Sequence, residues 1–390
     1  MYLEKLKRFV ASLEENSMVP LHRPYISDEE LTEIKKVLDS RWLTQGPKVQ
    51  EFEKSVQDYL GVKHAIACSS CTTALHLALM AFGLPDWSQI MVADYTYPAT
   101  AHATMYCNYK PVFVDVDPLT YNINIADAEQ KINKLITAII PVHTFGQCAN
   151  MDAINDFASA NRLYVIEDAA CAMGSKYNGE FAGTMGDIGC FSFHATKGVG
   201  IGEGGMVTTN NDKWAAKIRK LAYFGIESSW SKEKSDTFTL PIFDELGYNY
   251  KLSDVSAAMG LVQMRKLDKI IERKRVLAQN WDARLIGMEG ITKPFVDPKC
   301  YHNYQGYTTL VDASVDRDAL IQNLKERGVQ TQIGTYSCHI QPVYNSDIVC
   351  PISIYMYNHT LRLPMYYELT IEQIEEAAQI LEETLKWMLH

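Results

Sequence analysis

The fold is decided by the stretch Cys190-Phe191-Ser192-Phe193-His194-Ala195-Thr196-Lys197. It begins as a short apolar run and ends in polar residues and a lysine, which is typical of a buried strand that reaches the edge of its sheet. A second hydrophobic strand, Leu163–Ile166, leads directly to Asp168. In open α/β sheets, ligands bind beyond the carboxyl ends of the strands. Lys197 and Asp168 are therefore predicted to face one common site.

Short apolar runs alternate with helical stretches from about residue 50 to residue 265. Strands that alternate with helices imply a mostly parallel sheet that is covered by helices on both faces. The sequence therefore predicts an α/β fold with a large domain of this kind. The expected strands are Ala65–Cys68, Gln89–Val92, Pro111–Val114, Ala138–Val142, Leu163–Ile166, Cys190–Phe193 and Met206–Thr208.

The remainder of the chain predicts a second, smaller unit. Residues 1–265 are expected to form an N-terminal segment and the large domain, and residues 266–390 a linker helix and a small α+β domain. Capping boxes at Ser27–Glu30 and Thr370–Gln373 predict helices that begin there. The first twenty residues suggest a short amphipathic helix. Other expected elements are a helix at Val255–Leu267, a helix at Lys266–Leu285, a strand at Tyr304–Val311, and helices at Asp316–Arg327 and Thr370–Leu389.

Composition restricts the partners and the compartment. A formal net charge of −10 and a single short basic cluster, Arg273–Arg275, argue against nucleic acid. No apolar stretch reaches the roughly 18 residues of a membrane helix, and no signal peptide is apparent, so no membrane association is expected. Nine scattered cysteines suit reduced thiols and a cytoplasmic protein. Cys68-Ser-Ser-Cys71 has no second cysteine pair, so no metal site is expected.

A lysine and an aspartate at the ends of two strands are the fixed points of a pyridoxal phosphate (PLP) site. The amine of Lys197 is suited to form a Schiff base with the cofactor aldehyde and to move a proton afterwards. The carboxylate of Asp168 is suited to hold the pyridine nitrogen in its protonated form. Taken alone, Lys197 is more typical of a surface lysine and Asp168 of a helix cap, and it is their combination that favours the cofactor site.

Three loops supply further candidate contacts for the cofactor. The small hydroxyl residues of Ser69–Thr73 precede a helix, where free N–H groups and the helix dipole suit a phosphate. Tyr97 lies in a loop after a strand and could stack on a planar ring. Asn249 and Lys251 precede another helix and could reach a phosphate. Each segment also has an ordinary alternative, namely N-capping, loop packing and a surface turn.

The glycine-rich segment Gly198–Gly205 formally contains G-x-G-x-x-G. A dinucleotide fingerprint must open a helix, whereas this segment leads into Met206-Val-Thr-Thr209, which reads as a strand. The glycines are therefore predicted to let the chain turn tightly beside Lys197 rather than to bind a dinucleotide.

The order of motifs resembles that of the DegT/DnrJ/EryC1/StrS family, which are PLP-dependent sugar aminotransferases of fold type I. The resemblance runs from about Pro20 to Leu385. It rests on Trp42-Leu-Thr-x-Gly-Pro47, Ser69-x-x-Thr-x-Ala-Leu75, Tyr97-Pro-Ala-Thr100, Glu167-Asp-Ala-Ala170, Gly189-Cys-Phe-Ser-Phe-His-x-x-Lys197, Gly202-Glu-Gly-Gly205 and Gly247-Tyr-Asn-Tyr-Lys251.

The resemblance implies a role for each candidate residue at the cofactor. Lys197 is the Schiff-base lysine, Asp168 pairs with the pyridine nitrogen and Tyr97 stacks on the ring. The phosphate is held by Ser192 and by the amides of Thr72 and Thr73, and Asn249 reaches it from the neighbouring subunit of a homodimer with shared sites. Three positions depart from the family pattern. Cys71-Thr72-Thr73 stands in place of the usual Gly-Thr-Ala phosphate loop. Cys171 replaces the usual Gln or His, and Lys251 replaces an arginine that could contact a phosphate with two donors.

The resemblance also implies the reaction. Family members mostly transfer nitrogen from glutamate to a keto group on a nucleotide-linked 6-deoxysugar, for surface glycans or antibiotics. A diphosphate in an acidic protein needs local cations or donors, and the candidates are Arg23, Lys251, His302 and His339, with Tyr336 beside the sugar. Since these lie at both ends of the chain, the cleft is predicted to form between the two domains.

Three other functions remain open. The same fold could aminate another ketone, such as a 3-keto sugar, a keto-inositol or a small phosphorylated ketone. A non-catalytic regulatory protein that binds PLP is a second alternative, and the presence of both Lys197 and Asp168 speaks against it. Some members are dehydratases with histidine in place of the lysine. His194 is close by, but Lys197 is intact.

Overall fold

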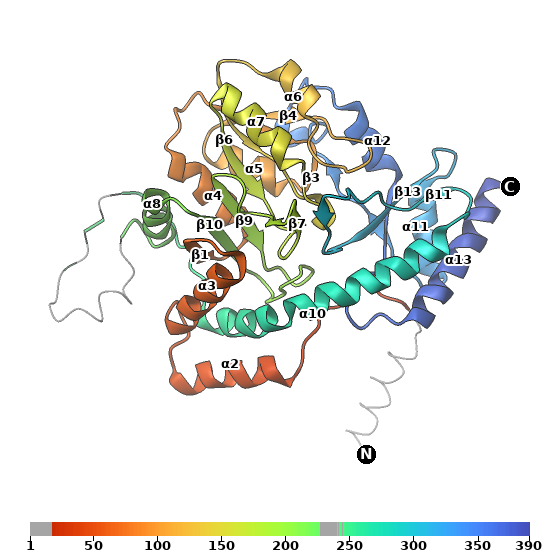
Figure 1. Cartoon of the computed structure of the whole chain (residues 1–390), viewed down its shortest axis with the longest axis horizontal. Helices are drawn as coiled ribbons and strands as arrows, with labels where there is room; N and C mark the ends of the chain where they lie inside the picture. Colours follow the sequence, from red (N-terminus) through yellow and green to blue (C-terminus); the bar gives the residue numbers. More distant parts are fainter. Residues whose placement is uncertain (1–17, 227–239, 241, 244) are drawn as a thin grey trace.

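The computed structural model describes residues 18–226, 240, 242–243 and 245–390. A seven-stranded sheet in the order β1-β10-β9-β6-β5-β2-β4 forms the larger unit (Figure 1). The strands β9, β6, β5, β2 and β4 are parallel, and β10 pairs antiparallel with β1 and β9. All seven strands expected from the sequence are present, as β1 His64–Cys68, β2 Gln89–Ala93, β4 Lys110–Val114, β5 Ile136–Ile140, β6 Tyr164–Asp168, β9 Ile188–Ser192 and β10 Gly205–Thr209.

Helices cover both faces of this sheet. Successive side chains of a strand point to opposite faces, and apolar residues occupy both, so each face must be buried. In β1, Ile66 packs into one apolar core, while Ala65 and Ala67 pack into the other. The Ala65 face is covered by α3 Pro47–Leu60, α6 Ile125–Lys131, α7 Met151–Asn161 and part of α10 Asp254–Leu285. The Ile66 face is covered by α4 Cys71–Phe82, α5 Ala99–Tyr106 and α8 Asp212–Ala222.

The long helix α10 spans Asp254–Leu285 and passes beneath both units (Figure 1). The sequence predicted two successive helices here, but the apolar positions continue without a break from Val262 to Trp281. Its start is fixed by Ser253, whose hydroxyl accepts a hydrogen bond from the Ser256 amide at 3.2 Å. The proposed domain boundary at residue 265 therefore falls inside a continuous helix.

The smaller unit is built on a four-stranded antiparallel sheet in the order β11-β13-β16-β14. Its strands are β11 Ile291–Thr292, β13 Tyr307–Val311, β16 Thr360–Leu363 and β14 Gln332–Ile333, and its helices are α11 Arg317–Glu326, α12 Pro351–His359 and α13 Ile371–Leu389. Trp281 of α10 lies in its core with Tyr307. The capping box at Thr370 is confirmed. Short pairings join β15 Tyr336–Ser337 to β3 Tyr95–Thr96, and β7 Lys176–Tyr177 to β8 Glu180–Phe181 and β12 Cys300–Tyr301. Two 3₁₀ turns lie at Thr144–Gly146 and Pro342–Tyr344.

The segment before α2 (Asp28–Ser40) packs on the smaller unit, although it is far from it in sequence. The Val19 amide donates to the Gly328 carbonyl at 2.8 Å, and the Met365 amide donates to the Leu21 carbonyl at 3.1 Å. The capping box at Ser27 is confirmed. The amphipathic helix expected in the first twenty residues falls largely on residues 1–17, which lie outside the described residues. None of the described helices is long and apolar enough to cross a membrane.

Candidate active site

A cavity of about 490 Å³ lies at the carboxyl end of the large sheet, and the smaller unit closes its other side. Strand ends of the large sheet contribute Asp168 and Ser192, and the smaller unit contributes Tyr336 and Arg362. The cavity therefore lies between the two units, as predicted. The predicted site residues that line it are Thr72, Tyr97, Asp168, Cys171, Ser192, Lys197 and Tyr336.

Asp168 is the last residue of β6 and is buried. Its Oδ2 accepts a hydrogen bond from the Thr100 hydroxyl at 2.7 Å, and its Oδ1 accepts from the Ala170 amide at 3.1 Å. Burial raises the pKa of this carboxyl, and these two bonds together with the charge of Lys197 oppose the rise. A carboxylate held in this way is suited to pair with a cation inside the cavity.

Lys197 follows β9 in a tight loop. Its Nζ donates to the Cys171 Sγ at 3.1 Å, and its amide donates to the His194 carbonyl at 2.8 Å. The glycine-rich segment folds back on this loop, since the Phe193 amide donates to the Gly204 carbonyl at 2.8 Å. The segment then enters β10, so it does not form the strand–turn–helix arrangement that a dinucleotide fingerprint needs.

The amino end of α4 forms another wall of the cavity. This helix begins at Cys71, earlier than the sequence suggested, because Ser70 and Thr73 form a capping box. The Thr73 amide donates to Ser70 Oγ at 3.2 Å, so it is already engaged. Thr72, Ser70 and Ser192 line the cavity and Thr73 does not, so the contact of the Thr73 amide with a phosphate stays a prediction.

Gly205 shows why this wall lies close to the lysine loop. A Cβ atom at Gly205 would lie 2.3 Å from the Ser70 carbonyl oxygen. Only a glycine lets β10 approach the amino end of α4 so closely. The ring of Tyr97 is 66% exposed and lies at the cavity, edge-on to Tyr336 with centroids 6.1 Å apart. One face of the Tyr97 ring is thereby open to a planar ligand.

Asn249 and Lys251 lie away from this cavity. Asn249 pairs with Tyr223 in an isolated antiparallel bridge, and Lys251 Nζ donates to Asn249 Oδ1 at 2.5 Å. The Lys251 ammonium lies 4.2 Å from the centroid of the Phe224 ring. Neither residue reaches the cavity of its own chain in this structure.

Two other predicted substrate residues also lie elsewhere. His302 is buried and stacks on Tyr304 at 4.2 Å, with its Nδ1 accepting from the Tyr304 amide. Burial lowers the pKa of His302 to about 3, so it carries no charge for a phosphate at neutral pH. Arg23 lines a separate cavity of about 20 Å³ behind the lysine loop, together with His22 and Lys274.

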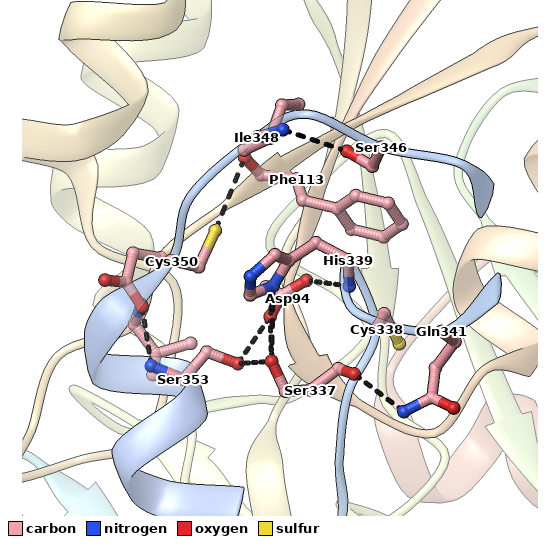
Figure 2. A network of polar contacts seen from close by, with 12 residues as sticks. Asp94, Phe113, Ser337, Cys338, His339, Gln341, Ser346, Ile348, Cys350 and Ser353 are labelled. Atoms are coloured by element: carbon pink, nitrogen blue, oxygen red, sulfur yellow. Dashed lines mark hydrogen bonds and ion pairs between the residues drawn. The ribbon is translucent and has the colours of Figure 1, made fainter.

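His339 belongs to a buried network and not to the cavity (Figure 2). Its Nδ1 donates to Asp94 Oδ2 at 2.7 Å, and its amide donates to Asp94 Oδ1 at 2.6 Å. The hydroxyls of Ser337 and Ser353 donate to Oδ2 at 2.8 and 2.5 Å. Cys350 brings its sulfur within 4.8 Å of the His339 and Asp94 ligand atoms. These four donors already occupy the acceptor positions of Asp94, so this cluster is a structural network.

Among the cavity residues that the sequence reasoning missed, Thr100 and Arg362 bear most directly on the chemistry. Thr100 positions Asp168, and its signal was the small residue after Tyr97-Pro-Ala. Arg362 lines the cavity from β16, and its signal was a charged residue in the apolar strand Leu361-Arg362-Leu363. The alternation of apolar and polar residues in a strand does not show whether the side that carries Arg362 faces solvent or a cavity.

The residues around the cavity fit PLP. Asp168 is a buried acceptor for a protonated ring nitrogen, Tyr97 offers an open ring face, and the amino end of α4 suits a phosphate. Lys197 has a sulfur partner, and no carboxylate among the described residues is bonded to its amine. An amine that is not tied into an ion pair is free to carry the cofactor.

Comparison with known protein families matches residues 24–382 to the DegT/DnrJ/EryC1/StrS aminotransferase family. The chain is 38% identical over 327 residues to GDP-perosamine synthase of Caulobacter vibrioides, covering 82% of this chain and 85% of that protein. It is 34% identical over 381 residues to the spore coat polysaccharide biosynthesis protein SpsC of Bacillus subtilis, covering 95% of this chain and 98% of SpsC. The aminotransferase TlmJ from Streptoalloteichus hindustanus superposes with a TM-score of 0.89 at 28% identity, covering 95% of this chain and 99% of TlmJ.

Proposed function

The chain belongs to the DegT/DnrJ/EryC1/StrS aminotransferase family, and on that premise we propose that it moves the amino group of L-glutamate onto a keto group of a nucleotide-linked 6-deoxysugar. It is an aminotransferase that uses PLP. The observation that carries the proposal is the meeting of Lys197 and Asp168 in one cavity between the two units. The names of its relatives, which concern perosamine and spore coat polysaccharide, support a role in surface glycan biosynthesis.

The residues of the cavity divide the chemistry among them. Bound PLP supplies an electron sink that stabilises a carbanion next to nitrogen. Asp168 holds the ring nitrogen protonated, and Thr100 keeps the carboxylate of Asp168 in place. Ser70, Thr72 and Ser192 hold the phosphate, and Tyr97 covers the ring.

Lys197 moves the proton. Its Nζ takes the proton from the α-carbon of glutamate and delivers it within the same cavity, and the reverse transfer occurs with the keto sugar. Since the Cys171 thiol is its only hydrogen-bond partner among the described residues, the amine can swing toward either position. Positioned proton transfer of this kind typically contributes about 10²–10⁴-fold in rate.

We also propose a homodimer with shared sites. Asn249 and Lys251 lie away from their own cavity, which is the arrangement expected if they serve the cavity of a second copy. Nearby side chains are apolar and exposed, among them Leu240, Ile242, Phe243 and Leu246, at 65–79%. Exposed apolar groups of this number are typical of a subunit interface. We place the protein in the cytoplasm, where free thiols persist.

Two experiments test these proposals. Enzyme mixed with L-glutamate alone should release one equivalent of 2-oxoglutarate and lose the absorbance of the lysine-bound cofactor. A panel of keto sugars linked to GDP and to other nucleoside diphosphates should then restore that absorbance. Preference for a simple phosphorylated ketone would replace the sugar proposal. For the shared site, mixed dimers of Lys197→Ala and Asn249→Ala subunits should regain activity that neither variant has alone.

A further inference from the structure

Arg362 is a cation of the cavity whose guanidinium makes no hydrogen bond or ion pair with any residue that the structure describes. It lines the cavity from the middle of β16, opposite Thr308 of β13 and Gln332 of β14. Its Nε is buried and makes no hydrogen bond, and no ion pair to Arg362 occurs among the described residues. Its guanidinium lies over the ring of Phe145, with the ring centroid 5.9 Å from the guanidinium carbon.

The surroundings of Arg362 are shaped to hold the guanidinium. Gly306 leaves the room for it, since a Cβ atom there would lie 3.0 Å from both Nε and Nη2. Phe145 adopts a φ of 56°, a left-handed conformation that is unfavourable for a bulky residue. Such conformations cluster at ligand sites, because the rest of the fold must hold them in place. Here the conformation supports the ring against which Arg362 lies.

A second cation lies close by and is also unpaired. Lys274 of α10 is buried, and no carboxylate is bonded to it among the described residues. Burial and then the charge of Arg362 lower the pKa of Lys274 to about 8. Burial, followed by the charges of Lys274 and Arg362, lowers the pKa of His22 to about 3. Lys274, Arg362 and His22 therefore lie within electrostatic reach of one another, and no carboxylate is bonded to Lys274 or Arg362 among the described residues.

A cation without a partner costs free energy when it is buried, as Lys274 is, or partly buried, as Arg362 is. The arrangement is understandable if an anion occupies it during the reaction. The planar fork of arginine matches a carboxylate with two parallel hydrogen bonds. Glutamate carries a carboxylate on the same carbon that must meet Lys197, whereas the diphosphate of a nucleotide sugar lies many bonds from the keto carbon. Arg362 and Lys197 are both electrostatic or hydrogen-bonding neighbours of Cys171, which places Arg362 at the reacting end.

Resting on the proposed function, we propose that Arg362 binds the α-carboxylate of the amino donor and of its 2-oxo acid product, and that Lys274 adds the second positive charge behind it. The pair makes the site select an acidic donor over a neutral amine. When the keto sugar replaces the donor, the carboxylate leaves with the 2-oxo acid. Arg362 therefore acts in one half of the reaction and not in the other.

The test measures glutarate binding by calorimetry, first on the cofactor-free protein and then on the holoenzyme. Arg362→Gln should weaken glutarate binding about 10- to 100-fold, the usual effect of losing a charge-assisted contact. Arg362→Lys should recover only part of that loss, because an ammonium lacks the fork. The exposed Arg265→Gln is the matched control and should bind as the wild type does.

The same variants separate this inference from the proposed function. Arg362→Gln should raise the KM for glutamate, with kcat/KM for the keto sugar in the second half-reaction nearly unchanged. If the wild type does not react with glutamate at all, the proposed function fails. If the wild type reacts and Arg362→Gln and Arg362→Lys both bind glutarate normally, the inference fails alone. A loss of nucleotide binding with normal glutarate binding would assign Arg362 to the sugar nucleotide instead.

Discussion

Asp94 and Arg362 are both charged, both lie where the two units meet, and they are treated in opposite ways by the fold. Asp94 accepts four hydrogen bonds, from the Ser337, Ser353 and His339 side chains and from the His339 amide (Figure 2). Arg362 has a buried Nε without a partner. The carboxylate of Asp94 has its hydrogen bonds made within the protein and so stabilises the fold. The guanidinium of Arg362 keeps hydrogen-bond donors that a ligand can use.

Asp115 supports the architectural side of this comparison. It lies just after β4, and its carboxylate accepts from the amides of Ile352 and Ser353 at the start of α12. Asp94 and Asp115 thus fix the loop and helix of the smaller unit to neighbouring strand ends of the large sheet. The wall of the cavity that carries Tyr336 is held from behind by these bonds.

Lys197→Ala should give the largest effect, and it should lower turnover without lowering stability. Turnover should drop by at least about 10²–10⁴-fold, since proton transfer is lost together with the covalent route for the cofactor. The midpoint of urea unfolding of the cofactor-free protein should stay near that of the wild type. Retention of a tenth of the wild-type turnover would mean that another residue moves the proton.

Asp94→Ala should reverse this pattern. It leaves the Ser337, Ser353 and His339 donors buried without an acceptor, which should cost about 3–5 kcal/mol of unfolding free energy. The exposed Asp58→Ala is the control, because its pair with Lys54 is on the surface. Urea unfolding curves measure both variants. A cost below about 1 kcal/mol for Asp94→Ala would show that the network is not structural.

Lys274→Met should show that an open charge lowers stability. The pKa of Lys274 is lowered from 10.5 to about 8, so the folded chain releases this proton at a lower pH than the unfolded chain. The folded state therefore loses up to about 3 kcal/mol below pH 8, and the loss shrinks as the pH rises toward 10.5. The methionine variant should be more stable than the wild type at pH 7, and the difference should fall as the pH rises.

Unfolding of both cofactor-free proteins at several pH values between 7 and 10 tests this. The titratable and charged groups around Lys274 are common to both proteins: Arg362, Cys171, Lys197, His22, Arg23, Tyr25 and Tyr367. A stability difference that does not change with pH would mean that Lys274 is uncharged, or paired, in the folded protein.

The same contrast explains what the sequence could and could not predict. Apolar runs predicted the seven strands, and the Ser/Thr-x-x-Glu/Gln pattern predicted both capping boxes. Both features depend only on residues that are close together along the chain. Lys197 and Asp168 line one cavity, as the sequence suggested, because strand ends of a parallel sheet converge. His339 and His302 were misjudged because a histidine bonded inside the protein and one that faces a ligand look alike in sequence. Arg362 was missed because only the folded structure shows that it lines the cavity and that its Nε has no hydrogen-bond partner.

Thr100→Val should have the smallest effect and tests a charge whose bonds are partly filled. Asp168 has one bond from Thr100 and one from the Ala170 amide, and its charge still faces the cavity. Burial already raises the pKa of Asp168, and removal of the Thr100 bond, which opposes that rise, should raise it further. A carboxyl that is easier to protonate pairs less well with a protonated ring nitrogen. The affinity for PLP should therefore fall about tenfold, the lower end of the effect of one bond to a charged group, as equilibrium dialysis would measure.

Thr104→Val is the matched control, because Thr104 lies on the same helix and its buried hydroxyl has no hydrogen-bond partner among the described residues. It should leave the affinity unchanged. An unchanged affinity in Thr100→Val as well would place Asp168 with the saturated, architectural carboxylates rather than with the open charges of the cavity.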